Sequence, residues 1–209
     1  MKLVNMNVED FMAKLASSDP TPGGGSAAAL SGVVGASLLQ MVCNLTIGRK
    51  KFAEHEGLME EIIAKCNEHG KALLEAIDKD AAAYDQVSAA YKMAKETDEE
   101  KKVRSAAIQE ALKIATMSPY DILDHSSKAL TLAHKAMGKT NPNAASDLGV
   151  AAKNLKTAME GAWMNILINL SGIKDEAFAA EIKEKSLAAL KCANELVTDI
   201  VAHVMTEIS

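Results

Sequence analysis

The sequence contains few aromatic residues, few cysteines and no excess of positive charge. Aromatic residues make up 3% of the 209 residues, too few for the core of a β-sheet or for a platform that stacks on nucleic-acid bases. The net charge of -5 argues against binding to a phosphate backbone, which needs clustered positive charge. The three cysteines form no Cys-x-x-Cys pair, which is typical of buried thiols in a reducing compartment. We therefore expect a cytoplasmic protein that does not bind nucleic acid.

Strong helix formers dominate the sequence instead, above all Ala, Leu, Met, Lys and Glu. Hydrophobic residues at 48% and charged residues at 24% give the balance of an ordinary globular protein. No linker, repeat or low-complexity stretch divides the chain. The composition predicts one all-α domain over residues 1–209, a bundle of long antiparallel helices.

One stretch has the length of a membrane-spanning helix, because no charged residue occurs between Ser26 and Arg49. It carries several polar side chains, however, and many Ala and Gly residues, which gain little from lipid but allow helices to pack closely. We predict a helix that protein buries on all sides, and no association with a membrane.

Capping signals and prolines predict the helix boundaries. Thr97 followed by Glu100 forms a capping box at the start of one helix. That helix should end near Met117, because the residue before Pro119 is biased away from helical geometry. Further helices are expected over 8–15, 26–47, 51–94, 119–138, 144–170 and 176–206.

A glycine-rich turn, Pro22-Gly23-Gly24-Gly25-Ser26, opens the uncharged helix. Free N–H groups at a helix start can bind an anion, and glycines allow it to approach closely. The turn is not a Walker A motif, because no Gly-Lys-Ser/Thr follows at the required spacing. A tight turn before a packed helix explains the residues equally well.

Three aspartates follow in the next predicted helix: Asp78, Asp80 and Asp85. Asp is a poor helix former, so three in eight residues carry a cost in helix stability. A carboxylate that is desolvated among the neighbouring alanines would have a raised pKa and could transfer protons near neutral pH. The alternative is a solvated face on which the carboxylates pair with Lys79. Asp80 and Tyr84 share one face of this helix.

Two polar stretches allow both structural and functional interpretations. Arg49-Lys50-Lys51 follows the uncharged helix, where cations complement the helix dipole, and could also attract an acidic ligand. Asn143 or Ser146 could cap the helix that begins near residue 144, and Asp147 would suit its first turn. The same groups could hold a polar ligand. The histidines form no ligand pair with metal-binding spacing, so we expect no metal site.

Asn165 and Asn169 lie one helical turn apart in an apolar run. Buried amides need hydrogen-bond partners, so they should either join neighbouring helices or line a pocket.

In this order the motifs resemble the cyclodeaminase/cyclohydrolase family of tetrahydrofolate enzymes, and the match covers nearly the whole chain. The family includes the C-terminal domain of formiminotransferase-cyclodeaminase, and no formiminotransferase domain precedes the motifs in this sequence. The resemblance rests on Pro22–Ser26, Gly48–Phe52, Asp78–Ala81, Ser146–Ala152, Asn165–Leu170 and Asp175–Phe178.

The resemblance implies an all-α homodimer with a folate pocket near the subunit interface and without a metal or organic cofactor. Its substrate is a folate that can carry several glutamates. It also implies the site residues. These are Asp80 and Asp147 as the catalytic groups, Asp78 beside them, Gly23, Gly24, Gly25 and Ser26 as a site loop, Arg49 and Lys51 as a clamp for the glutamate tail, and Asn143 and Ser146 as further substrate-binding residues.

The implied reaction is cyclodeamination of 5-formimidoyltetrahydrofolate, in which N10 attacks the formimidoyl carbon and ammonia leaves. The match to the cyclodeaminase domain runs end to end and favours this reaction. An alternative is hydrolysis of 5,10-methenyltetrahydrofolate to 10-formyltetrahydrofolate, which passes through a similar tetrahedral carbon. A second alternative is a helical dimer that binds folate without catalysis, whose pocket carboxylates would already be paired with Lys or Arg.

Overall fold

The computed structural model describes residues 2–209, which form six α-helices and three short 3₁₀ helices and contain no strand. The predicted all-α class is therefore confirmed. The elements in chain order are η1 (Leu3–Asn5), α1 (Val8–Leu15), α2 (Gly24–Asn44), η2 (Lys50–His55), α3 (Glu56–Lys92), α4 (Asp98–Ala136), η3 (Pro142–Ala144), α5 (Ala145–Leu170) and α6 (Glu176–Ile208).

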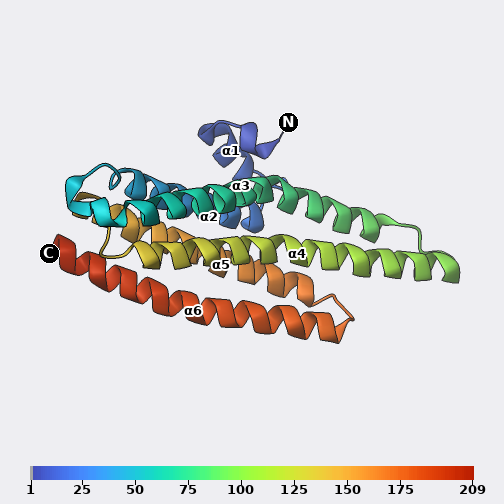
Figure 1. Cartoon of the computed structure of the whole chain (residues 1–209). Helices are drawn as coiled ribbons and strands as arrows, with labels where there is room; N and C mark the ends of the chain where they lie inside the picture. Colours follow the sequence, from blue (N-terminus) through green and yellow to red (C-terminus); the bar gives the residue numbers. More distant parts are fainter. Residues whose placement is uncertain (1) are drawn as a thin grey trace.

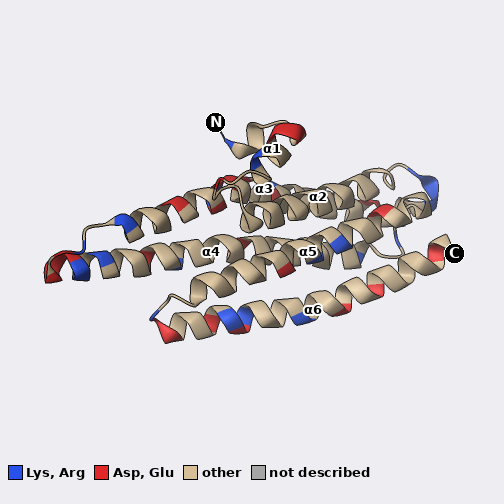
Figure 2. Cartoon of the chain, turned by 180° about the vertical axis from the view of Figure 1, so that it is seen from behind, with Lys and Arg blue, Asp and Glu red and all other residues tan. Residues whose placement is uncertain are grey.

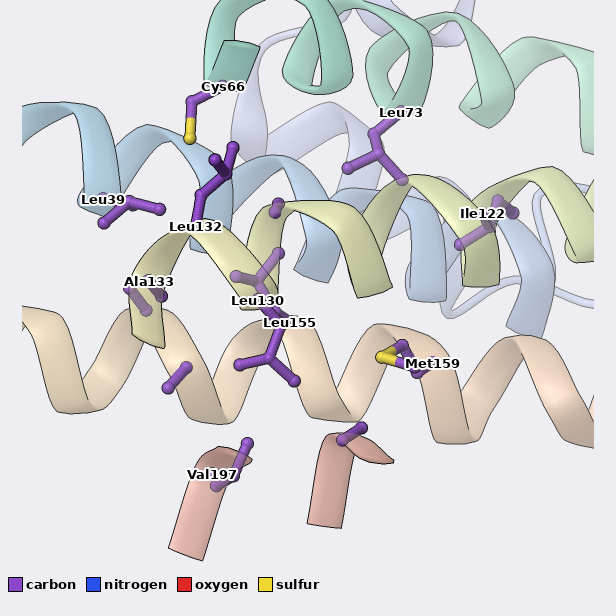
Figure 3. Close-up of a cluster of buried hydrophobic side chains, with 14 of the residues drawn as sticks. Leu39, Cys66, Leu73, Ile122, Leu130, Leu132, Ala133, Leu155, Met159 and Val197 are labelled. Carbon is purple, nitrogen blue, oxygen red and sulfur yellow. The ribbon is translucent and has the colours of Figure 1, made fainter. Parts of the chain in front are cut away.

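The five long helices, α2 to α6, lie lengthwise side by side, and the short α1 lies outside this bundle (Figure 1). Helix α2 packs against α3 and α5, α4 packs against α3 and α5, and α6 packs on the outer side of α4 and α5. Their apolar faces meet in one core of small and branched side chains (Figure 3). Leu39 of α2, Leu73 of α3, Leu130 of α4 and Leu155 of α5 are fully buried there.

Helix α2 is much shorter than its neighbour α3. Its 21 residues span about 32 Å, whereas the 37 residues of α3 span about 56 Å. Helix α2 therefore covers only one half of α3, and its first turn lies against the middle of that helix (Figure 1). This mismatch in length positions the cavity described below.

The predicted stop near Met117 is wrong, because α4 continues through Pro119 as one helix. Proline has no N–H to donate to the carbonyl four residues earlier, which leaves the oxygen of Ala115 without its helical partner. The Asn169 side chain supplies the missing donor, with 2.7 Å between its Nδ2 and that oxygen. A donor from α5 thus allows α4 to tolerate the proline.

The capping box predicted at Thr97 is confirmed, and the helices expected over 8–15 and 176–206 begin at polar caps of the same local kind. Asn7 accepts a hydrogen bond at the start of α1, Thr97 and Glu100 form the capping box of α4, and Asp175 caps α6. The start of the 51–94 segment differs, because Lys50–His55 forms a 3₁₀ turn before α3 begins.

The prediction that α2 is buried on all sides is correct only in part. Ten of its residues are buried, yet Val34 and Met41 form part of a stripe that is exposed. Within residues 2–209, α2 is the one helix whose length and hydropathy would suffice to cross a membrane, and half of its most apolar window is buried in the bundle. Met164 and Ile168 of α5 are exposed as well.

The three thiols differ in their surroundings, contrary to the prediction that all are buried. Cys43 and Cys66 are buried, and burial raises the pKa of each thiol to about 12. Cys192 is exposed on α6.

Gly35 allows α2 and α5 to cross closely. A Cβ atom at this position would lie 2.6 Å from Leu155 Cγ and 2.9 Å from the backbone oxygen of Ala151. Because a backbone oxygen cannot easily move away, we expect Gly35→Ala to lower the free energy of unfolding by about 1–3 kcal/mol. Urea unfolding followed by circular dichroism measures this change.

Gly57→Ala in α3 is the matched control, because no atom lies within 4 Å of the added Cβ. Alanine favours a helix over glycine by about 1 kcal/mol, so this variant should be as stable as the wild type or more stable. Equal stabilities of the two variants would contradict the proposed close crossing.

Candidate active site

A cavity of about 310 Å³ lies where α2 begins, between its first turn and helices α3, α4 and α5. The 3.6-residue periodicity of each helix directs a few polar side chains into it among small apolar ones. The cavity is lined by Pro20, Thr21, Gly23, Gly24, Gly25, Asp80, Ala83, Tyr84, Val87, Ala115, Asn165, Ile168 and Asn169.

The carboxylate of Asp80 lies directly against the glycine turn. A Cβ atom on Gly25 would lie 2.1 Å from Asp80 Oδ1 and 2.6 Å from Oδ2. At these distances any side chain at position 25 would overlap with the carboxylate. Only glycine at position 25 therefore allows the carboxylate to reach the first turn of α2. This contact joins the predicted loop Gly23–Ser26 and the predicted catalytic residue Asp80 in one place.

Ser26 holds the Asp80 carboxylate from the same turn. Its hydroxyl lies 3.2 Å from Asp80 Oδ2 and 2.9 Å from the backbone oxygen of Ile77, and its backbone N–H also donates to the carboxylate. Burial raises the pKa of Asp80 above its ordinary value, and the hydrogen bonds from Ser26 offset only part of this rise. The N–H group at the start of α2 thus donates a hydrogen bond to a carboxylate of the protein itself.

No lysine or arginine among residues 2–209 lies within ion-pair distance of Asp80. The neighbouring Lys79 pairs with Glu75 instead, at 3.3 Å. A carboxylate that is partly buried, as Asp80 is, carries a desolvation cost when it has no cationic partner, and a cationic ligand would compensate this cost. This arrangement differs from the paired carboxylates expected of a pocket without catalysis.

Asn165 and Asn169 direct their amide nitrogens at backbone oxygens and leave their amide oxygens free. Asn165 Nδ2 donates to the oxygen of Gly161 at 2.9 Å, and Asn169 Nδ2 donates to that of Ala115. A carbonyl can only accept, so the atom that faces it must be the nitrogen. Both side chains line the cavity, which therefore offers acceptors to a ligand rich in N–H donors.

Asp78, the third predicted carboxylate, lies outside the cavity. Its Oδ1 accepts a hydrogen bond of 2.6 Å from the backbone N–H of Leu3 and so ties the N-terminal segment to α3. This tether explains the position of Asp78, and its role in substrate binding stays a prediction. Asp85 is exposed, as expected for a solvated face.

The segment between α2 and α3, which contains Arg49 and Lys51, lies at the end of the bundle opposite to the turn between α3 and α4 (Figure 2). Arg49 is exposed, and its Nε donates to the oxygen of Leu45 at 2.7 Å, where it caps the end of α2. Lys51 is exposed and lies 5.5 Å from the ring centre of Phe52. Neither lines the cavity of its own chain.

Asn143, Ser146 and Asp147 lie at the same end as Arg49, because Asn141, the residue before η3, donates hydrogen bonds to Thr46 and Leu45 just after α2. The cap of η3 is Asn141, whose Oδ1 accepts from the backbone N–H of Asn143, so neither Asn143 nor Ser146 acts as the cap. Asp147 stands 18 residues before Asn165 on α5, which corresponds to about 27 Å along the helix. The two predicted catalytic aspartates of one chain are therefore far apart.

Three residues that line the cavity were not included in the predicted site, although the sequence pattern pointed to each of them. Tyr84 follows Asp80 by one helical turn and lines the same cavity. Asn165 and Asn169 were expected either to join helices or to line a pocket. Both line the cavity, and Asn169 also joins α5 to α4. Within residues 2–209, no group of three potential metal ligands comes together.

The comparisons with known proteins agree with this geometry. The family model described as formiminotransferase-cyclodeaminase matches residues 7–188. The chain belongs to this family. One curated relative of the chain is a methenyltetrahydrofolate cyclohydrolase of Methylorubrum extorquens. The two sequences are 42% identical over 94% of the chain and 96% of the relative.

Two further relatives carry the other activity in their names. The formimidoyltransferase-cyclodeaminase of Sus scrofa is 32% identical over 90% of the chain, which spans 35% of that longer protein. The crystal structure of a formiminotetrahydrofolate cyclodeaminase from Thermotoga maritima superposes with a TM-score of 0.81 at 27% identity and covers 99% of the chain and 97% of that structure. The family member thus has the fold of these folate enzymes.

The raised pKa of Asp80 predicts a gain in stability at neutral pH when its charge is removed. The folded state binds this proton more tightly than the unfolded chain does, so folding stability falls as the pH rises from the ordinary carboxyl pKa through the raised one. Asp80→Asn should therefore be more stable than the wild type at pH 8, and the difference should vanish below about pH 4.

Urea unfolding at a series of pH values measures this difference. The exposed Asp85→Asn serves as a control that should follow the wild type at every pH. A less stable Asp80→Asn protein at pH 8 would show that the carboxylate is stabilised in the fold, contrary to the prediction.

Proposed function

We propose that this protein hydrolyses 5,10-methenyltetrahydrofolate to 10-formyltetrahydrofolate. The observation that carries the proposal is the partly buried carboxylate of Asp80, which has no lysine or arginine partner among residues 2–209 and lies in a cavity lined by amide acceptors. The substrate carries a positive charge over N5, the bridging carbon and N10, and this cation would supply the missing partner. The 42% identity to a cyclohydrolase over nearly the full length of both chains supports the same reaction.

The chemistry follows from a carboxylate that can hold and release a proton. Asp80 takes a proton from water while the water oxygen bonds to the bridging carbon, which gives a neutral tetrahedral intermediate. Asp80 then donates the proton to N5 while the bond between this carbon and N5 breaks, and it accepts the hydroxyl proton as the formyl carbonyl forms. Release of that proton to solvent restores the carboxylate. The steps balance with substrate and water, without a metal or organic cofactor.

The second candidate is cyclodeamination of 5-formimidoyltetrahydrofolate, the reaction that the resemblance favoured. The similarity to the cyclodeaminase structure from Thermotoga maritima over nearly the whole chain supports it. There, Asp80 would protonate the leaving ammonia after N10 has attacked the formimidoyl carbon. Both reactions stabilise a tetrahedral carbon between N5 and N10, so one cavity suits either substrate.

Incubation of the purified protein with each substrate distinguishes the candidates. Loss of methenyl absorbance identifies the cyclohydrolase, and ammonia release from the formimidoyl substrate identifies the cyclodeaminase. A protein that binds tetrahydrofolate but turns over neither substrate would be a binding protein, and the proposed catalysis would be wrong.

Asp80→Asn should lower the turnover number by about 10²- to 10⁴-fold, because the amide can neither take nor donate the proton. Asp85→Asn lies on the same helix outside the cavity and should retain full turnover. Circular dichroism should show both variants folded. Full activity of the Asp80→Asn enzyme would remove Asp80 from the mechanism.

We further propose that the protein is a homodimer formed through the exposed apolar stripe on α2 and α5. Val34 and Met41 of α2 and Met164 and Ile168 of α5 contribute to this stripe, and Ile168 also borders the cavity. A two-fold axis perpendicular to these antiparallel helices would bring the Asp147 end of one copy to the Asp80 cavity of the other. In this arrangement the partner would supply the positive charges for a glutamate tail.

Ile168→Glu tests the dimer, because a charge on this 71% exposed side chain would be buried in the interface without a partner. We expect a monomer in sedimentation equilibrium and a loss of activity. Met205→Glu on α6, which is 53% exposed outside the stripe, should remain dimeric and active. A wild-type monomer with full activity would contradict the proposed dimer.

A further inference from the structure

Tyr84 lies at the mouth of the Asp80 cavity with no partner in the fold. Its side chain is 47% exposed. Among residues 2–209, no residue makes a hydrogen bond with its hydroxyl, and neither an aromatic ring nor a cation stacks on its ring. Hydrogen bonds and ring contacts within the fold therefore do not explain why a large aromatic side chain stands at this position of α3. Its place on the cavity wall points to a contact with a ligand.

The glycine turn forms another wall of the same cavity. Gly23 and Gly24 present backbone to it instead of side chains, and Gly25 is in contact with Asp80. A cavity with an aromatic ring and a backbone wall leaves room for a flat group. Tyr84 also follows Asp80 by four residues on α3, which places their Cβ atoms about 6 Å apart on one face of the helix.

The proposed substrate has one benzene ring, and it is attached directly to N10. The reduced half of the pterin is puckered, so the aminobenzoyl ring is the part of the molecule best suited to stacking on a tyrosine. When the bridging carbon lies at Asp80, this ring begins one bond beyond N10, toward the mouth of the cavity. With the Cβ atoms of Asp80 and Tyr84 about 6 Å apart, the tyrosine ring is within reach of a group attached to N10 when the reacting carbon lies at the carboxylate.

We propose that Tyr84 stacks on the aminobenzoyl ring of the substrate and so holds N10 beside Asp80. This inference rests on the proposed function, because it requires a tetrahydrofolate in the cavity. The inference adds Tyr84 as a residue that binds the aminobenzoyl part of the substrate, outside the pterin.

Two ligands separate a contact with the aminobenzoyl ring from a contact with the pterin. Tetrahydrofolate contains both groups, whereas 6-methyltetrahydropterin lacks the aminobenzoyl ring. We expect Tyr84→Ala to raise the Kd of tetrahydrofolate about 10-fold, the effect of losing an aromatic pair and its buried area. The Kd of the tetrahydropterin should stay unchanged. Anaerobic isothermal titration calorimetry measures both constants on the full-length protein.

Two variants serve as controls. Tyr84→Phe keeps the ring and should bind tetrahydrofolate like the wild type, because the hydroxyl has no partner. Tyr91→Ala removes a tyrosine that is 51% exposed two helical turns farther along α3 and does not line the cavity, so it should also bind like the wild type.

Unchanged binding of tetrahydrofolate by Tyr84→Ala would overturn the stacking contact while the proposed function stands. An equal loss for both ligands would also overturn it, because Tyr84 would then act on the pterin. Absence of tetrahydrofolate binding by the wild-type protein would overturn the proposed function together with this inference.

Discussion

The contact between Gly25 and the carboxylate of Asp80 is the constraint on which the site depends. It brings the first turn of α2 against the middle of α3, and any side chain larger than hydrogen at position 25 would prevent it. The same contact shields the carboxylate partly from water, which raises its pKa, while the turn supplies the hydrogen bonds that keep it in place. Position, burial and proton affinity of the group thus share one structural cause.

The opposite wall of the cavity depends on a second long-range interaction. Asn169 satisfies the carbonyl that Pro119 leaves free in α4, and its remaining oxygen belongs to a residue that lines the cavity. One amide therefore supports a continuous α4 and contributes to the ligand surface. Because α2 covers only half of α3, this surface stays open toward the longer helices, and the mouth carries the exposed side chains of Tyr84 and Ile168.

The sequence predicted those features whose causes are local. Helix caps, the glycine turn and the periodicity of apolar residues depend on a few neighbouring residues, and the structure agrees with them at Asn7, Thr97 and Asp175. The stop near Met117 failed because the donor that rescues Pro119 comes from a residue 54 positions away. A rule based on the residues next to a proline contains no information about such a partner.

The sequence predicted individual residues of the site but not which of them lie together in the fold. Asp78 and Asp80 are two residues apart, which turns their side chains about 200° from each other around the helix, and only one of them lines the cavity. Which of the two does so depends on where α2 and the N-terminal segment pack. The separation of Asp80 from Asp147 likewise follows from the antiparallel packing of α2 and α5, which motif order along the chain does not contain.

The hydrogen bond between Leu3 and Asp78 joins residues that are 75 positions apart in the chain. Because a polypeptide is synthesised from its N-terminus, the first segment to leave the ribosome has to wait for α3 before it finds this acceptor. The earliest residues thus reach their native position only after residue 78 has emerged, and until then the apolar side chain of Phe11 stays uncovered.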